Sequence, residues 1–270
     1  MEKYTIQEFR KDFPDEKACL EYIFNRKYPD IKGYYYVKGR KCFANSKGKQ
    51  IHPIKGTVFE HSSTPLTLWF YAIYLFSSSR NGVSAKELQR QLGVTYKTAW
   101  RMGYQIRRLM VQDKKMLSGD VEVDETYFGG KDKQADKFKN KSAVMGMVER
   151  KGKVKAYQIE GRQNHLILGN IKRNVKKGSN LITDEFSVYK KTPNLGYDHK
   201  YVKHGKKKYT YGDVNTNSIE GFWSQFKRSV DGTYHSVSSK HLQSYVDEFS
   251  FRYNQRASSS PLFERMMGKI

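Results

Sequence analysis

The sequence predicts a mixed α/β protein, in which a sheet-based domain follows a helical region and a small β module. A chain of 270 residues is long enough for a sizeable core and two or three folding units. Near residue 118 the spacing of apolar residues changes from helical to strictly alternating. Beyond that point three strand-like segments precede a helix, a fourth strand and two more helices, the order of a mixed α/β domain.

The chain is strongly basic. It has 50 Lys and Arg against 27 Asp and Glu, for a formal net charge of +23. Such a surface repels itself and attracts polyanions, and phosphate neutralisation supplies most sequence-independent nucleic-acid binding. We therefore expect DNA as the partner, with ribosome-like packing or simple solubility as the alternatives.

Other features limit the protein class. Two cysteines, Cys19 and Cys42, exclude a disulfide framework. The longest apolar run, 66–76, is too short to span a bilayer, and the N-terminus has no apolar signal segment. We expect a cytoplasmic, nucleoid-associated protein with no membrane partner.

The composition divides the chain into four parts. The first is rich in aromatic residues, Gly and Lys, and its segments 34–43 and 49–60 have the pattern of short strands joined by glycine turns. The second opens with a helix for which Thr64 is a candidate cap and Pro65 the first residue. The expected parts are a β module at 1–62, a helical region at 63–117, the α/β domain at 118–256 and a tail at 257–270.

Two helices joined by a short turn follow in the helical region, which is the layout of a helix-turn-helix. Ser84 is placed to cap the first helix, with Glu87 three residues on. Gly93 makes the turn, and Thr95 is placed to cap the second helix. The start of that helix would present four side chains to DNA: Tyr96, Lys97, Thr98 and Arg101. An ordinary helical hairpin is the alternative.

Carboxylates gather in the α/β domain of this otherwise basic protein. Strand alternation places Asp120, Glu122 and Asp124 on one face. Asp184 follows an apolar run, at the end of a buried strand, and Glu220 lies early in a helix. Neighbouring carboxylates repel unless a cation neutralises them, and Mg²⁺ prefers oxygen ligands. Asp124, Asp184 and Glu220 are the candidate ligands, whereas the first two acids are more simply solvated residues or salt-bridge partners.

Such acids would suit metal-dependent cleavage of DNA. Two divalent ions roughly 3.5–4 Å apart can activate a water or a 3′-hydroxyl and stabilise the leaving oxygen of a phosphodiester. Asn217 and Lys227 lie one turn before and two turns after Glu220, near the same helical face. A basic stretch at 199–218 is placed to hold the phosphate backbone. The expected phosphate contacts are Lys206, Lys207, Lys208, Lys227 and Arg228.

Several long motifs resemble those of the DDE transposases of bacterial insertion sequences, most closely the ISXO2-like group. The segments are VEVDETYFGGK (121–131), LITDEFSVY (181–189), NTNSIEGFWSQFKRSV (215–230) and GVSAKELQRQLGVTYKTAWRM (82–102). The resemblance covers about 10–256. It implies an RNase H-like catalytic domain that cleaves transposon ends with Mg²⁺ or Mn²⁺, in a two-ion site, and transfers the 3′-hydroxyl into target DNA.

The resemblance also implies roles for individual residues. Asp124, Asp184 and Glu220 take the places of the three catalytic acids, and Lys227 that of a phosphate contact. Some members of the group have Asn in the third position, which keeps Asn217 as the alternative metal ligand. The partners implied are the terminal inverted repeats and target DNA. Because two ends are joined to one target, we expect at least a homodimer on DNA.

One part departs from the group's pattern, which includes an N-terminal zinc ribbon with paired cysteines. Tyr28 and Ile31 occupy the first pair, and Cys42 and Asn45 lie near the second. Cys42 and His52 alone cannot make a four-ligand structural zinc site. We expect a ribbon-shaped module without zinc, held by its aromatic residues.

Two other functions are compatible with these residues. One is an RNase H-like endonuclease that cleaves without strand transfer. The other is a DNA-binding protein, derived from a transposase, that has lost catalysis. The tail has too few apolar residues for a domain, and we expect it to dock on a partner subunit.

Overall fold

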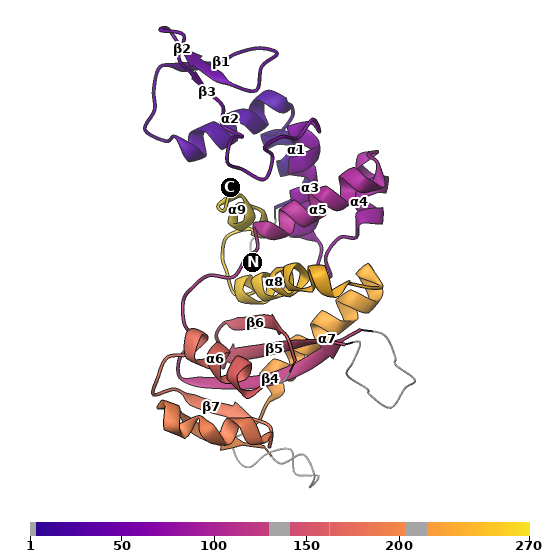
Figure 1. Ribbon diagram of the computed structural model, residues 1–270. Coiled ribbons are helices and arrows are strands. Elements are labelled where there is room, and N and C mark those ends of the chain that lie inside the picture. Colours follow the sequence, from indigo (N-terminus) through magenta and orange to yellow (C-terminus); the bar gives the residue numbers. More distant parts are fainter. Residues whose placement is uncertain (1–3, 130–140, 162, 203–214) are drawn as a thin grey trace. The chain divides into compact units, whose positions relative to one another are not determined.

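The computed structural model describes residues 4–129, 141–161, 163–202 and 215–270 (Figure 1). The chain forms two compact units. The first consists of Met1–Met110 and Ala257–Ile270, and the second of Val111–Arg256. The tail thus belongs to the same unit as the N-terminal part.

The first unit combines helices with a small antiparallel sheet. Its helices are α1 (Ile6–Asp12), α2 (Glu16–Lys27), α3 (Leu66–Ser78), α4 (Ala85–Leu92), α5 (Tyr96–Arg108) and α9 (Leu262–Met267). Its strands are β1 (Tyr34–Tyr36), β2 (Phe43–Asn45) and β3 (Gln50–Ile51), in the order β1-β2-β3. The description of 1–62 as a β module missed α1 and α2. Both have clear start signals, a capping box of Thr5 with Glu8 and a cap at Asp15.

The helical region has the helices that the sequence predicts. Ser84 accepts a hydrogen bond from the Glu87 N–H at 3.1 Å, and Thr95 accepts one from the Thr98 N–H at 3.2 Å. Gly93 takes the left-handed conformation at φ 64°, which ends α4. The two expected caps and the turn are therefore confirmed.

The start of α3 differs from the expectation. Thr64 does not cap it, and Pro65 is the residue before its first turn. The Leu66 N–H donates instead to Glu16 Oε2 at 2.7 Å, so a side chain of α2 supplies the cap.

The tail packs within its own chain. Leu262, Phe263, Met266 and Met267 of α9 are buried. The Phe263 ring lies 5.1 Å from the ring of Tyr4 and 5.6 Å from that of Phe13, measured between centroids. The apolar face that we expected a partner subunit to cover is covered by the first unit itself.

The second unit is built on a five-stranded mixed sheet. Its strands are β4 (Asp120–Phe128), β5 (Ser142–Glu149), β6 (Val154–Ile159), β7 (Asn180–Thr183) and β8 (Asp198–Tyr201), in the order β6-β5-β4-β7-β8. The β6-β5-β4 ladder is antiparallel, whereas β7 and β8 pair parallel to β4. The predicted α/β class is confirmed, and this sheet is consistent with an RNase H-like domain.

Helices cover both faces of this sheet (Figure 1). On one face, α6 (Asn164–Asn174) and the 3₁₀ segments η1 (Ser187–Lys191) and η2 (Pro193–Leu195) pack against residues such as Val121 and Val123. On the other, α7 (Asn217–Ser229), the π-turn η3 (Val230–Tyr234) and α8 (Ser239–Gln255) pack against Val144 and Val148. Each residue of β4 therefore points to one core or the other, as alternation requires.

Strand β8 was not expected, because three of its four residues belong to the basic stretch at 199–218, for which we predicted no strand. Its side chains are exposed or half-buried, as at the edge of a sheet, and its sequence DHKY lacks the apolar alternation of a core strand. In the described ranges, no helix is both long enough and apolar enough to cross a membrane.

Candidate active site

The first two candidate acids lie on neighbouring parallel strands. Glu122 of β4 is paired in register with Ile182 of β7. Asp124 and Asp184 are each two residues further along, so the same register brings them side by side and on the same face. β7 ends at Thr183 while β4 continues to Phe128, so the pair lies at the carboxyl end of β7, beside the middle of β4. The carboxyl ends of parallel strands are where ligands bind in open α/β sheets.

Asp124 carries the strongest electrostatic perturbation of these acids. Burial, together with the charges of Glu125 and Asp184, raises the pKa of Asp124 to about 6. Glu125 itself faces the opposite core, where it accepts a hydrogen bond from the Tyr189 hydroxyl. Two carboxylates and little solvent make the ionised form of Asp124 costly, which is the situation that a bound cation relieves.

Trp223 of α7 borders Asp124. The register places Gly146 opposite Asp124, and a Cβ added to Gly146 would lie 2.5 Å from Cζ2 of Trp223. Trp223 Nε1 is buried, has no hydrogen-bond partner among the described residues, and lies close enough to Asp124 to lower its pKa slightly. A buried donor without a partner is uncommon and needs an acceptor. Trp223 itself is 4% exposed and packs in the core on this face of the sheet.

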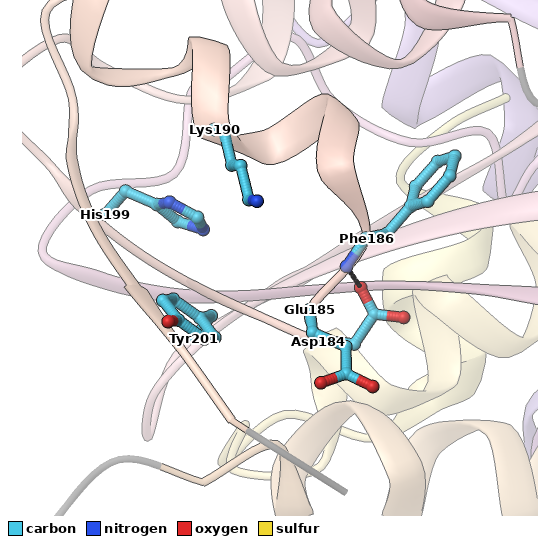
Figure 2. Close-up of a pocket in the computed structure, with 6 residues that line it drawn as sticks. All are labelled: Asp184, Glu185, Phe186, Lys190, His199 and Tyr201. Atoms are coloured by element: carbon cyan, nitrogen blue, oxygen red, sulfur yellow. Dashed lines mark hydrogen bonds between the residues drawn. The ribbon is translucent and has the colours of Figure 1, made fainter. Parts of the chain in front are cut away.

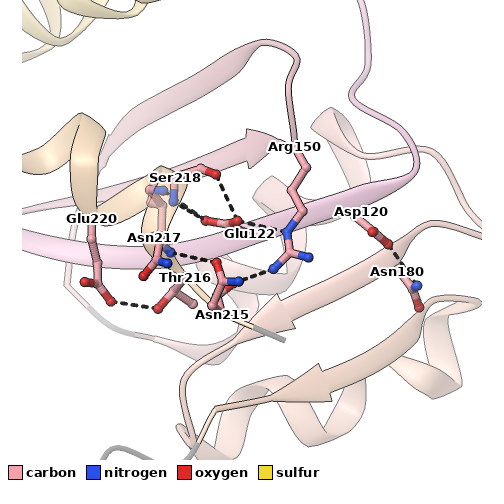
Figure 3. A network of polar contacts seen from close by, with 10 residues as sticks. Asp120, Glu122, Arg150, Asn180, Asn215, Thr216, Asn217, Ser218 and Glu220 are labelled. Atoms are coloured by element: carbon pink, nitrogen blue, oxygen red, sulfur yellow. Dashed lines mark hydrogen bonds and ion pairs between the residues drawn. The ribbon is translucent and has the colours of Figure 1, made fainter. Parts of the chain in front are cut away.

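Glu122 connects β4 to the first turn of α7 (Figure 3). Its side chain is fully buried and accepts hydrogen bonds from the Ser218 N–H at 2.8 Å, the Ile219 N–H at 3.0 Å and the Ser218 hydroxyl at 3.0 Å. Arg150 donates to the same carboxylate at 3.0 Å and to the Asn215 carbonyl at 2.8 Å. The expected salt-bridge role is confirmed, and the carboxylate also caps the helix that carries Glu220.

The third acid is placed differently from the first two. Glu220 is exposed and accepts a hydrogen bond from the Thr216 hydroxyl at 2.7 Å. Asn217, the alternative ligand, is exposed at the first position of α7. Within the described parts of the chain, no three His, Cys, Asp or Glu side chains are grouped closely enough to hold a metal ion. Asp124 and Asp184 are thus brought together, whereas Glu220 is not grouped with them.

A small pocket of about 240 Å³ opens beside Asp184 (Figure 2). It is lined by Asp184, Glu185, Phe186, Lys190, His199 and Tyr201. Asp184 is held by the Phe186 N–H, which donates to its Oδ1 at 3.0 Å. Burial lowers the pKa of His199, which therefore stays uncharged at neutral pH. Glu185, Phe186 and Lys190 were not among the candidates from the sequence, whereas His199 and Tyr201 belong to the basic stretch at 199–218 that was expected to hold the phosphate backbone.

The candidate DNA contacts lie on both units. On α5, Tyr96, Lys97 and Arg101 are exposed and Thr98 is half-buried. Lys86 lies over the Tyr96 ring, 5.0 Å from its centroid. The other candidates are Lys227 and Arg228, which are exposed on α7, and Lys206, Lys207 and Lys208, which lie outside the described residues.

Comparisons with known proteins identify relatives. The model of the ISXO2-like transposase domain matches residues 116–254. An uncharacterized protein in the transposable element ISH50 of Halobacterium salinarum is 27% identical over 219 residues, covering 73% of this chain and 72% of that protein. A chain from the cryo-electron microscopy structure of a simian T-cell lymphotropic virus intasome, in complex with the PP2A regulatory subunit B56 gamma, is 12% identical. The match covers 66% of each chain, and its TM-score of 0.33 is too low to establish a shared fold.

Proposed function

We propose the chemistry of this chain from its family. It belongs to the ISXO2-like transposase family, whose domain covers 116–254, and is therefore an insertion-sequence transposase. The protein binds the terminal inverted repeats of its element, cleaves the 3′ ends in a metal-dependent reaction and transfers them into target DNA. Asp124, Asp184 and Glu220 are the proposed catalytic acids. The DDE family points to a polynucleotidyl transferase, which needs no protein nucleophile.

One observation carries this proposal most strongly. Asp124 and Asp184 adjoin where β7 ends beside the middle of β4, and burial together with neighbouring charge raises the pKa of Asp124 to about 6. A half-buried acid pair beside a pocket is costly unless it holds a cation, and the protein is otherwise basic enough to bind DNA.

The donor set fits Mg²⁺ or Mn²⁺ in its chemistry. Asp124 and Asp184 supply carboxylate oxygens, and Mg²⁺ sites commonly use one or two carboxylates completed by waters and substrate phosphates. Bound ions, two in our proposal, would supply charge stabilisation at the phosphodiester and lower the pKa of an attacking water or hydroxyl. Glu220, or Asn217 in its place, would complete the set.

The protein's own residues orient this site. Glu122 and Arg150 fix the start of α7 against β4, and the Phe186 N–H holds Asp184 in place. Lys227 and Arg228 of α7 would hold the DNA backbone next to the acids. A helix-turn-helix made by α4 and α5 would read the terminal repeat through Tyr96, Lys97, Thr98 and Arg101. We propose the β1–β3 module as a zinc-free counterpart of the family's ribbon, and at least a dimer on DNA.

The test uses purified protein, a labelled duplex with the element's own terminal repeat, a target plasmid, and Mg²⁺ or Mn²⁺. Asp124→Asn, Asp184→Asn and Glu220→Gln are compared with wild type. Asp120→Asn is the matched control, because Asp120 lies on the same strand, is exposed, and its side chain accepts a hydrogen bond from the Asn180 amide and from no other described residue. We expect cleaved and joined products with wild type and the control, and neither product with the three variants.

The outcomes separate the alternatives. Cleavage without joining would favour an RNase H-like endonuclease. Tight, salt-sensitive binding without either product would favour a DNA-binding protein that has lost catalysis. If only Glu220→Gln stays active, the same assay with Asn217→Ala decides whether Asn217 is the third ligand.

A further inference from the structure

The pocket beside Asp184 has no role in the cleavage chemistry proposed above, and its position indicates another one. It lies where the neighbouring parallel strands β7 and β8 end: Thr183 is in register with Tyr201, and Asp184 follows directly. Ligands of open α/β sheets bind at this edge. DNA held for cleavage at Asp124 and Asp184 must place the nucleotides next to the cleaved phosphate close to this pocket.

The lining favours a flat, uncharged ligand. His199 and Tyr201 contribute rings that lie 6.2 Å apart at an interplanar angle of 31°, whereas the ring of Phe186 points away from them (Figure 2). The Tyr201 side chain is 48% exposed, so its ring is accessible. His199 is fixed by a 3.0 Å hydrogen bond between its Nε2 and the Thr183 hydroxyl. Figure 2 shows His199, Tyr201 and Lys190 around the space next to Asp184 and Glu185.

Size and charge select among the parts of DNA. At about 240 Å³ the pocket is smaller than the roughly 300–1,000 Å³ of sites for drug-sized ligands, so it suits one base rather than a base pair. Asp184 and Glu185 would repel a bare phosphate. A base has hydrogen-bond donors that carboxylates accept, and Lys190 can hold the phosphate attached to it.

We propose that this pocket receives one unpaired base of the DNA end, next to the cleaved phosphate, with Tyr201 as its stacking surface and Lys190 as a contact to the adjoining phosphate. This proposal rests on the proposed transposase function. The base must leave the duplex to enter, as enzymes that act within a duplex commonly require. Stacking on an aromatic ring would compensate for the lost pairing.

The test measures the affinity of the full-length protein for its terminal-repeat duplex, with Ca²⁺ in place of Mg²⁺. Single abasic nucleotides are scanned across the cleavage position. Wild type should bind about 5- to 100-fold more weakly when one particular flanking base is missing, the range expected for one base–aromatic stack. Tyr201→Phe, which keeps the ring, should show the same loss.

Tyr201→Ala should bind the intact end more weakly by a similar factor and should no longer respond to the abasic position. Because Tyr201 lies exposed on an edge strand, this variant should fold, which circular dichroism checks. Lys190→Gln should weaken binding, whereas its neighbour Lys191, outside the pocket lining, serves as the matched control: Lys191→Gln should keep the full abasic response.

Two results would overturn the proposal. If wild type binds and cleaves the end but Tyr201→Ala responds to abasic sites as wild type does, the base pocket is wrong and the transposase function stands. If wild type neither binds nor cleaves the end, the proposed function fails and the pocket proposal fails with it.

Discussion

Glu122 offers the sharpest test of how the fold supports the site. Replacing it with Ala would leave the Ser218 and Ile219 N–H groups without their acceptor and Arg150 without its ion-pair partner. A buried donor left unsatisfied costs about 1–3 kcal/mol, and breaking a buried ion pair costs about 3–5 kcal/mol. These costs overlap, and Arg150 is 21% exposed and can partly rehydrate. We expect Glu122→Ala to lower the free energy of unfolding by about 3–5 kcal/mol.

Glu122→Gln should cost less, about 1–3 kcal/mol, because its amide oxygen can still accept from the two helix N–H groups. It loses the charge that pairs with Arg150. Asp120→Asn, an exposed change on the same strand, should cost under about 0.5 kcal/mol. The assay is urea unfolding combined with hydrogen exchange of peptides covering 217–229, because a chain of two compact units need not unfold in one transition.

The reasoning also predicts where the damage falls. Amides in the first turn of α7 should lose protection before those of α8 do, because Glu122 bonds only to the former among its helix contacts. If Glu122→Ala lowers stability by less than about 1 kcal/mol, or leaves α7 protection unchanged, then Glu122 does not hold the helix as we infer.

Three further changes test other parts of the structure. Because the pKa of Asp124 is raised to about 6, the native state keeps a proton that the unfolded state releases near 3.9, so the stability of wild type falls as pH rises from about 4 to 6. Asp124→Asn should remove this fall and so be more stable than wild type above that range. Urea unfolding without metal, at about pH 4 and about pH 6, should show that wild type loses about 2–3 kcal/mol that the variant keeps. Gly146→Ala should lower the free energy of unfolding by about 1–3 kcal/mol in thermal unfolding, because the new Cβ would lie 2.5 Å from Trp223 and 2.7 Å from Ile219. Gly169→Ala in α6 has open space around the new Cβ and should raise it by up to about 1 kcal/mol. Equal effects of the two changes would exclude the close packing at Gly146. Lys227→Gln should weaken binding to all DNA sequences alike and reduce the slope of log affinity against log salt by about 1, and an unchanged slope would remove it from the interface.

Local patterns were enough to predict most of the second unit. Alternation identifies the strand of Asp124, and the apolar run before Asp184 identifies a buried strand end, so both acids could be placed before the structure was known. The same local rules miss β8, because an edge strand with the sequence DHKY has no apolar face to reveal it. They also missed α1 and α2, although the capping residues Thr5 and Asp15 were visible.

Long-range partners could not be predicted in this way. The hydrogen bonds from α7 to Glu122 connect residues that are separated by 96 and 97 positions in the sequence. Arg150 donates both to Glu122 and to the Asn215 carbonyl just before α7. Nothing in the residues near Glu122 distinguishes a helix cap from a solvated strand acid. The pocket beside Asp184 has the same origin, since Lys190, His199 and Tyr201 meet only through the parallel pairing of β7 with β8.

The acids on β4 have different roles, although they are close together on the same strand. Glu122 and Asp124 point to the same face two residues apart, yet one is neutralised inside the protein and the other is not. Arg150 and the start of α7 satisfy Glu122 fully, which anchors the helix. The Glu125 N–H and the Trp223 indole stabilise the charge of Asp124 only in part, because burial and the charges of Glu125 and Asp184 outweigh them and raise its pKa to about 6. A strand whose buried acid Glu122 is satisfied and whose half-buried acid Asp124 is not fits our proposal that the second acid binds a cation.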